Sequence, residues 1–131
     1  MPYVLIETRR EYSEAEEVAL IDAVHGALRQ AFRIPPEDRH VRLITHLPHR
    51  FAVPPAITQP DRFTLVSIDA FAGRSLEAKR ELYREIVEGL EPLGIPRDHV
   101  SILLREMPRA NWGIRGGIAA CDVELGFDVN V

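Results

Sequence analysis

Two segments of the chain carry apolar residues at the spacing of an amphipathic helix. The first runs from residue 13 to about residue 32, and the second starts at Ser75 and ends at Gly94-Ile95-Pro96. Ser13 and Glu16 also have the three-residue spacing of a capping box, which starts a helix. The pattern therefore predicts two helices, with apolar stripes formed by Ile21, Val24, Leu28 and Ala31 or Phe32 and by Leu82, Ile86, Leu90 and Leu93.

Four shorter segments are predicted to form β-strands. The sequence Tyr3-Val4-Leu5-Ile6 is apolar and partly β-branched, which is typical of a buried strand. Apolar and polar residues alternate over residues 41–47, and Pro48 ends that segment. Residues 63–70 and 100–106 are the other two predicted strands. Each predicted helix thus lies between two strands along the chain.

The two strand-helix-strand segments are related by an internal repeat. Ser13 matches Ser75 at an offset of 62 residues, and Pro48 matches Pro108 at an offset of 60. We therefore expect one α+β domain, with a first βαβ unit at about 2–48, a connection at 49–62 and a second unit at about 63–108. A helical crossover makes the two strands of each unit parallel. The expected fold is a four-stranded sheet with two helices on one face.

The other face of this sheet has no predicted helix, and an apolar sheet face needs a cover. A homo-oligomer is the expected cover. Residues 109–131 form a C-terminal region in which apolar and polar residues alternate from Val123 to Val131. This period of two predicts a further strand, placed to pair with a neighbouring subunit.

Composition narrows the classes of partner. The chain has 131 residues and a formal net charge of -4, without a basic run, which argues against nucleic acid or an anionic membrane as partner. No stretch approaches the ~20 apolar residues of a membrane span. The first residues lack the pattern of a signal peptide, and the single Cys121 cannot form an internal disulfide. We therefore expect a cytoplasmic protein.

The start of the chain carries a candidate catalytic group. Met1 is followed by Pro2, a small residue that allows methionine aminopeptidase to expose a prolyl amine. An α-amine titrates near ~8, and burial or a neighbouring cation lowers its pKa toward neutral pH. Such an amine is a candidate general base, acid or nucleophile. The alternative is an ordinary second residue, since proline is common there and a retained Met1 blocks the amine.

The histidines are weaker candidates. His46 and His49 are separated by a proline and have no third ligand at zinc spacing, so no metal site is expected. His25 lies among apolar positions and is expected to pack against the sheet or its edge. His40 is expected to begin a strand or to line a pocket.

Three further motifs, taken together with the second-position proline, resemble the tautomerase superfamily. They are Pro35-Pro36-Glu37-Asp38-Arg39, Arg74-Ser75 and Asn111-Trp112-Gly113-Ile114-Arg115-Gly116-Gly117. In this order they are most similar to the malonate semialdehyde decarboxylase group, and the match covers nearly the whole chain. The resemblance implies a single tautomerase-like domain over residues 1–131, a homotrimer with active sites near subunit boundaries, and small oxo-acid substrates, without a cofactor.

The resemblance also implies the residues of the site. The expected catalytic residues are Pro2, Asp38 and Arg74, and the expected substrate-binding residues are Arg74, Trp112, Ile114 and Arg115. The group tends to have two arginines that bracket one residue before the second helix, whereas this chain keeps only Arg74. Ile114 stands where an aromatic residue is common. The alternative for Arg74 is a surface arginine that pairs with Glu77 or Asp69.

Two classes of function remain open. The first is an enzyme that decarboxylates or hydrates a 3-oxo or acetylenic oxo acid through Pro2, or that acts as a keto-enol tautomerase with Pro2 as base. The second is a non-catalytic trimeric binding protein. Burial and Arg74 lower the pKa of a prolyl amine, whereas Asp38 raises it. Because one bracketing arginine is missing, the sequence favours the cationic acid over the neutral base.

Overall fold

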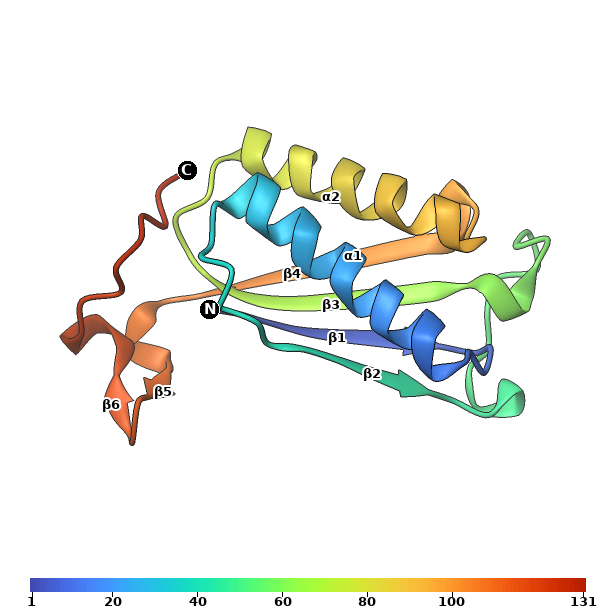
Figure 1. The fold of residues 1–131 in the computed structure, drawn as a ribbon, viewed down its shortest axis with the longest axis horizontal. Coiled ribbons are helices and arrows are strands. Elements are labelled where there is room, and N and C mark those ends of the chain that lie inside the picture. The colour runs from blue at the N-terminus through green and yellow to red at the C-terminus, as the bar shows by residue number, and fades with distance from the viewer.

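The computed structural model describes residues 1–131 as a sheet with two helices on one face (Figure 1). The first unit consists of β1 (Pro2–Thr8), α1 (Glu14–Phe32) and β2 (Val41–Thr45). The second unit consists of β3 (Thr64–Phe71), α2 (Leu76–Leu90) and β4 (Val100–Met107). A small hairpin follows, formed by β5 (Gly113–Ile114) and β6 (Ile118–Ala119).

The sheet has the strand order β2-β1-β3-β4, and the strands within each unit are parallel. The two central strands are antiparallel, with Pro2 opposite Ala70 and Thr8 opposite Thr64. The two units are therefore related by a pseudo-twofold axis, which places the starts of β1 and β3 at opposite ends of the sheet. The predicted tandem βαβ fold, with four strands and two helices on one face, is confirmed.

Both helices start at a serine cap. Ser13 accepts a hydrogen bond from the backbone N–H of Glu16 at 3.2 Å, and the Glu16 carboxylate accepts one from the backbone N–H of Ser13 at 3.0 Å. The predicted capping box is thus confirmed. Ser75 accepts from the N–H of Ala78 at 3.1 Å, and its hydroxyl donates to the carbonyl oxygen of Val131 at 2.9 Å. This last bond ties the end of the chain to the start of α2.

The core lies between the helices and the sheet. The predicted apolar stripes supply its helical side, with only Ile21 and Leu93 half-buried at the margins. Each fully buried aliphatic side chain contributes roughly 1.5–3 kcal/mol relative to an exposed one. The fully buried members from the strands and helices include Val4, Ile6, Val66, Ile68, Leu20, Phe32, Leu82, Ile86 and Leu90. Neither helix is long and apolar enough to cross a membrane.

The opposite face of the sheet is open in the protomer (Figure 1). Leu103 of β4 is 50% exposed and Ile44 of β2 is 46% exposed. Their neighbours Leu104 and Leu43, which point the other way, pack against the core. Large apolar side chains exposed on an open sheet face are typical of a surface that another subunit covers.

The C-terminal segment departs from its predicted structure. Residues 123–131 form no strand in the protomer, and Gly126 has a left-handed conformation with φ 83°. The alternating pattern reflects packing on the protomer instead, because its apolar side chains contact a small cluster of buried residues. The side chains that pack there are Val123, Leu125, Phe127 and Val129, and the rest of the cluster includes Phe71, Trp112 and Ile114.

Candidate active site

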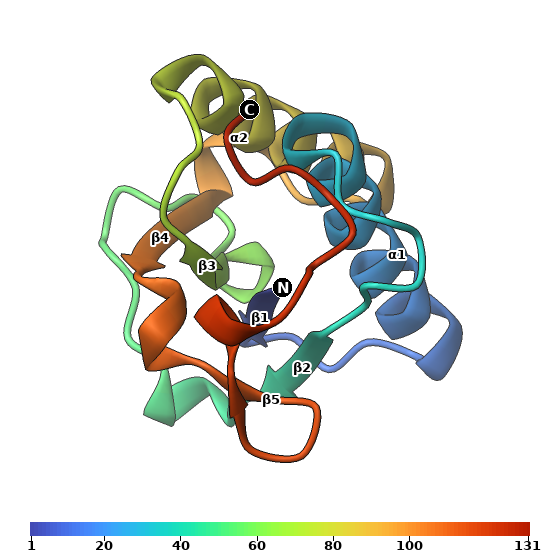
Figure 2. The same cartoon turned by 90° about the vertical axis from the view of Figure 1, so that its left-hand side faces the viewer.

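The start of the chain lies in the interior of one end of the molecule. Pro2 is the first residue of β1, is buried, and pairs with Ala70 of β3. Figure 2 shows the N-terminus at the centre of this end, where the C-terminal segment passes it on the way to the start of α2. Because β1 is flanked by β2 and β3, the position of the first residues is well defined.

Asp38 brings a carboxylate to the start of the chain. Its side chain is only 8% exposed, and its Oδ2 forms an ion pair with the α-ammonium group of Met1. The other oxygen, Oδ1, is buried without a hydrogen-bond partner and lies 3.6 Å from Nε2 of His40. The loop after α1 holds Asp38 there, since Arg33 turns the chain in a left-handed conformation and the N–H of Asp38 donates to the carbonyl oxygen of Pro35 at 3.0 Å.

Burial and charge act on this α-amine in opposite directions. Burial lowers the pKa of the Met1 amine below its ordinary value of 8.0, because desolvation disfavours the charged form. The hydrogen bond and the charge of Asp38 raise that pKa, and the charge of Arg74 lowers it. The net shift of the pKa is downward. An amine at this place therefore has more of its neutral, basic form at neutral pH than an exposed amine has.

Arg74 is a buried cation with unused hydrogen-bond donors. It directly precedes the N-cap of α2 and is 6% exposed. Its Nη1 donates to the carbonyl oxygen of Phe71 at 3.1 Å, and its guanidinium carbon lies 4.7 Å from the centre of the Phe32 ring. Nε and Nη2 are buried without a partner. These two nitrogens form one edge of the guanidinium, which can hold a carboxylate by two parallel hydrogen bonds.

The same edge of another arginine holds a carboxylate in this protein. Arg105 donates from Nε and Nη2 to the two oxygens of Asp69 at 2.6 and 3.2 Å. Glu77 in turn pairs with Arg80. Both carboxylates considered as surface partners of Arg74 are thus engaged elsewhere, and the alternative of a surface ion pair is wrong. Burial lowers the pKa of the Arg74 guanidinium, in agreement with its place inside the protein.

A pocket of about 220 Å³ opens beside the amine. Its lining includes Met1, Asp38, His40, Arg115, Leu125 and Phe127. Arg115 has a left-handed conformation with φ 49°, and its Nη1 donates to the carbonyl oxygen of Glu124 at 3.1 Å. The pocket is smaller than the clefts that hold drug-sized ligands, which fits a small acid. The structure therefore brings two predicted residues, Asp38 and Arg115, to the start of the chain.

Trp112 and Ile114 belong to a buried cluster that packs with Met1 and Tyr3 at the start of β1, and they do not line this pocket. The Trp112 ring meets those of Tyr3 and Phe71 edge to face, with centroids 5.0 and 4.9 Å apart. Ile114 belongs to the same buried cluster. The indole Nε1 of Trp112 is buried without a partner. In the protomer, these two residues therefore support the site and do not form its wall.

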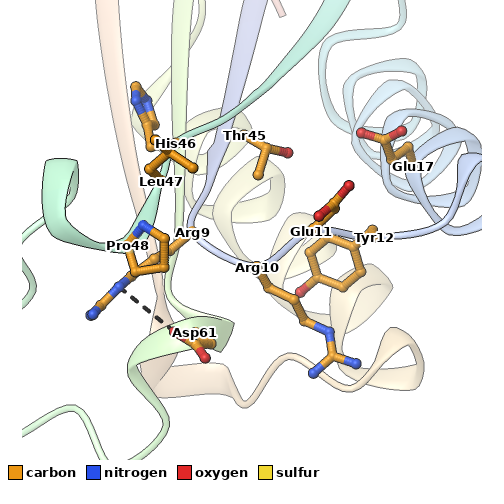
Figure 3. A pocket seen from close by; sticks show the side chains of 10 residues that line it. All are labelled: Arg9, Arg10, Glu11, Tyr12, Glu17, Thr45, His46, Leu47, Pro48 and Asp61. Atoms are coloured by element: carbon orange, nitrogen blue, oxygen red, sulfur yellow. Dashed lines mark ion pairs between the residues drawn. The ribbon is translucent and has the colours of Figure 1, made fainter.

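The largest pocket, of about 660 Å³, lies at the other end of the sheet, and none of the predicted catalytic or substrate-binding residues lines it. Figure 3 shows the residues that line it. It lies between the segment after β1 and the segment after β2, and it includes an ion pair between Arg9 and Asp61 at 3.6 Å. The pseudo-twofold axis makes this end the counterpart of the amine end. It has no α-amine, because the start of β3 is inside the chain.

The charges of this second end also differ. The residue before the N-cap of α1 is Tyr12, where the residue before the N-cap of α2 is Arg74. Negative charge in the first helical turn opposes the binding of an anion at a helix N-terminus. The first turn of α2 contains one acidic residue, Glu77, whereas that of α1 contains three, Glu14, Glu16 and Glu17. The N-terminus of α2 is therefore the better of the two helix N-termini for a carboxylate, although the pocket at its end of the sheet is smaller and Arg74 does not line it, and although Arg9 and Arg10 line the larger one.

His25 contributes to the site in a way that the sequence did not indicate. It is buried, and its Nε2 lies 3.1 Å from the backbone oxygen of Asp38. The expected contact with the sheet or its edge is thus replaced by a contact with the loop after α1. The spacing of 13 residues between the two positions carries no signal for this contact, because the loop conformation decides it. His40, by contrast, lines the pocket, as one of its two expected roles requires.

Comparison with known sequences gives a matching family and relatives described as probable tautomerases. The sequence profile of a family described as tautomerase enzyme matches residues 38–115. A probable tautomerase of Ralstonia nicotianae is 34% identical over 53 residues, which are 40% of this chain and 76% of that protein. A probable tautomerase of Lactiplantibacillus plantarum is 31% identical over 61 residues, which are 46% of this chain and 94% of that protein.

Solved structures agree in fold over almost the whole chain. FG41 malonate semialdehyde decarboxylase inhibited by 3-bromopropiolate has a TM-score of 0.81 and 28% identity, over 89% of this chain and 92% of that one. A fused 4-OT, described as a symmetric trimer, has a TM-score of 0.80 and 23% identity, over 91% and 96%, and shows the fold alone. With its profile match over residues 38–115 and the βαβ repeat described above, the chain belongs to the tautomerase enzyme family.

Proposed function

We propose that this protein, once Met1 has been removed, is an enzyme that acts on a small oxo acid through the amine of Pro2. The observation that carries the proposal is the buried edge of the Arg74 guanidinium, whose Nε and Nη2 have no hydrogen-bond partner. Arg74 is also close enough to the α-amine for its charge to lower the pKa of that amine. Buried polar groups are nearly always hydrogen-bonded, so an exception needs an explanation. The carboxylate of a substrate supplies both missing acceptors.

The proposed roles follow from the positions of the groups. Arg74 holds the substrate carboxylate, and the amine of Pro2 exchanges a proton with the reacting carbon or oxygen. Asp38 adjusts the pKa of the amine or orients a water molecule. Arg115 stands at the pocket, and Trp112 and Ile114 keep the start of β1 in place.

For a 3-oxo acid, the proposed reaction is decarboxylation or hydration. A cationic Pro2 amine polarises the 3-oxo group, the bond between C2 and the carboxylate carbon breaks, and carbon dioxide leaves. The resulting enolate then takes up a proton at C2. The similarity to two solved malonate semialdehyde decarboxylases, at 28% and 26% identity, supports this reaction.

The second candidate is keto-enol tautomerisation. A neutral Pro2 amine removes the proton of an enol hydroxyl and returns a proton to the adjacent carbon, so that the keto form results. The lowered pKa of the α-amine at this place favours the neutral base. The curated relatives, both described as probable tautomerases, support the same reaction.

We further propose that residues 1–131 are one domain and that the active protein is a homotrimer. The exposed Leu103 and Ile44 supply an apolar face for the contact, and the relative described as a fused 4-OT symmetric trimer has the same fold. A non-catalytic trimer remains the alternative, and a retained Met1 favours it. The intact mass of the protein from cells distinguishes the two, because removal of Met1 lowers it by one methionine residue.

The decisive experiment is a substrate screen with protein of verified mass. Processed protein is incubated with phenylenolpyruvate, malonate semialdehyde and acetylenic oxo acids, and product formation is followed by NMR. Turnover that Pro2→Ala abolishes supports the proposal and names the reaction. Full activity of Pro2→Ala removes the proline from the mechanism, and the absence of turnover on all three classes favours the binding protein.

A further inference from the structure

A chain of hydrogen bonds runs from the surface of α1 to the backbone of Asp38. Arg39 donates from Nη2 to the carboxylate of Asp22, and its Nη1 lies 3.3 Å from Nδ1 of His25. Nε2 of His25 lies 3.1 Å from the backbone oxygen of Asp38. Asp22 and His25 belong to α1, whereas Asp38 and Arg39 belong to the loop that follows it. The chain of bonds therefore fastens this loop to the side of the helix.

The partners of His25 determine its protonation state. A backbone carbonyl oxygen only accepts hydrogen bonds, so Nε2 must carry a proton. A guanidinium group only donates, so Nδ1 must be unprotonated. The ring is therefore neutral, with its proton on Nε2, and both of its nitrogens have the partner they need. Because His25 is only 4% exposed, the loss of either partner leaves a buried polar atom unsatisfied.

We infer that His25 is a positioning residue for the active site, which holds the peptide unit of Asp38 so that its carboxylate stays against the α-amine. The structure shows this contact for the amine of Met1, and the inference rests on the proposed function, in which removal of Met1 leaves the amine of Pro2 beside the same carboxylate. The carboxylate carbon is only three bonds away from the backbone carbon whose oxygen His25 contacts. Fixing the peptide unit thus limits where the side chain can point.

Few other contacts hold the loop. The N–H of Asp38 donates to the oxygen of Pro35 at 3.0 Å, and the N–H of Val4 donates to the oxygen of His40 at 2.9 Å. The first bond lies within the loop, and the second holds the chain after Asp38 at the edge of β1. Arg39 and Asp22 also link the loop to α1, but His25 is the helix residue that contacts the backbone of Asp38 itself. Without this contact, the backbone oxygen of Asp38 loses its hydrogen bond to α1, and the position of the carboxylate against the amine is less restricted.

The pKa of the α-amine reports whether the Asp38 carboxylate lies beside it. Asp38 raises the pKa of the α-amine, while burial and the charge of Arg74 lower it. Loss of the hydrogen bond between His25 and the Asp38 backbone should therefore lower the pKa of the Pro2 amine, as loss of the carboxylate itself should. A residue that only stabilises the fold has no such effect on this pKa.

The test uses His25→Phe, which keeps a ring but has no donor, and His25→Gln, whose side-chain N–H can replace Nε2. The exposed His49, in a separate short helix, provides the matched control His49→Phe. The pKa of the Pro2 amine is measured by NMR on processed protein labelled with 15N-proline, and kcat/KM is measured on the substrate found in the screen.

We expect His25→Phe to lower the amine pKa toward the value in Asp38→Asn and to reduce kcat/KM about tenfold, as lost outer-shell partners do. His25→Gln should recover much of both, and His49→Phe should change neither. In the Asp38→Asn background, His25→Phe should have no further effect on the pKa. If His25→Phe does not fold, His25→Asn serves instead, because its shorter polar side chain reaches the place of Nδ1 but not that of Nε2, and it should shift the pKa in the same direction.

An unchanged amine pKa in a folded His25→Phe protein overturns the inference, even when its melting temperature falls. So does an unchanged pKa in Asp38→Asn, since Asp38 then does not act on the amine. If the pKa follows the expected pattern but no variant turns over any substrate, the positioning role stands and the proposed function fails. The NMR titration needs no substrate, so the two outcomes are distinguishable.

Discussion

The carboxylate of Asp38 contacts the α-amino group of Met1 although 37 positions separate the two residues in the sequence. The contact is mostly buried, and the charge of Arg74 acts on the same amine. An anion and a cation thus influence one amine in opposite directions at the start of β1. This arrangement allows the chemistry of the amine to be adjusted by either neighbour.

The first prediction concerns the pH dependence of activity. A neutral amine is the base in tautomerisation, so kcat/KM should rise with pH through the pKa of the Pro2 amine. Burial lowers the pKa of the Met1 amine at this end of the sheet, and we expect it to lower that of Pro2 below the value of an exposed prolyl amine. Asp38→Asn removes an anion and should move the midpoint to lower pH. Arg74→Ala removes a cation and should move it to higher pH. A pH-rate profile of the three proteins checks the signs.

A profile that falls with increasing pH through the same midpoint indicates a cationic acid instead. In that case Asp38→Asn narrows the active range and Arg74→Ala widens it, and decarboxylation or hydration becomes the better assignment. If neither variant moves the midpoint of the pH-rate profile, neither Asp38 nor Arg74 acts on the pKa of the amine.

The second prediction is that Arg74 binds the substrate carboxylate. Arg74→Ala should cost about 2 to 4 kcal/mol in kcat/KM, because it removes one partner of a desolvated charge pair. Arg74→Lys should recover little, since an ammonium group cannot reproduce the two parallel hydrogen bonds. Arg80→Ala, at an exposed arginine of α2, is the control and should leave kcat/KM unchanged. Unaltered kinetics in Arg74→Ala would place the carboxylate elsewhere, with Arg115 the next residue to test.

The third prediction concerns assembly through the open face of the sheet. Leu103→Asp places a charge on this face and should convert the trimer to smaller species in light scattering at micromolar concentration. Val18→Asp is the matched control, because Val18 on α1 is 49% exposed and Leu103 is 50% exposed. The control should stay trimeric. A wild-type protein that is monomeric under these conditions contradicts the proposed assembly.

The fourth prediction concerns the caps of the helices. Ser13→Ala and Ser75→Ala should each lower the free energy of unfolding by about 1 kcal/mol in urea titrations. Only Ser75→Ala also removes the hydrogen bond to Val131. It should therefore speed amide hydrogen exchange in residues 128–131, whereas Ser13→Ala should not. Equal exchange in both variants would mean that the bond to Val131 does not hold the C-terminal segment.

Local periodicity in the sequence was enough to predict the helices, the four main strands and their tandem arrangement. Helical stripes and caps depend on residues three or four positions apart, and the offset between Ser13 and Ser75 marked the repeat. The candidate residues Pro2, Asp38 and Arg74 also came from the sequence, through the resemblance to a family. Their chemistry was predictable because residue type limits what a side chain can donate, accept or titrate.

The tertiary structure decided which groups meet. The alternation of apolar and polar residues over 123–131 indicates that one side of the segment is buried. It does not indicate whether the backbone pairs with a strand, so a packed irregular segment and a strand have the same pattern. The contact of His25 with Asp38 depends on a left-handed turn at Arg33. The edge of Arg74 is without a partner, while Arg105 uses the same edge to hold Asp69 of the neighbouring strand. Such contacts join residues distant in sequence, and only the folded chain sets their distances.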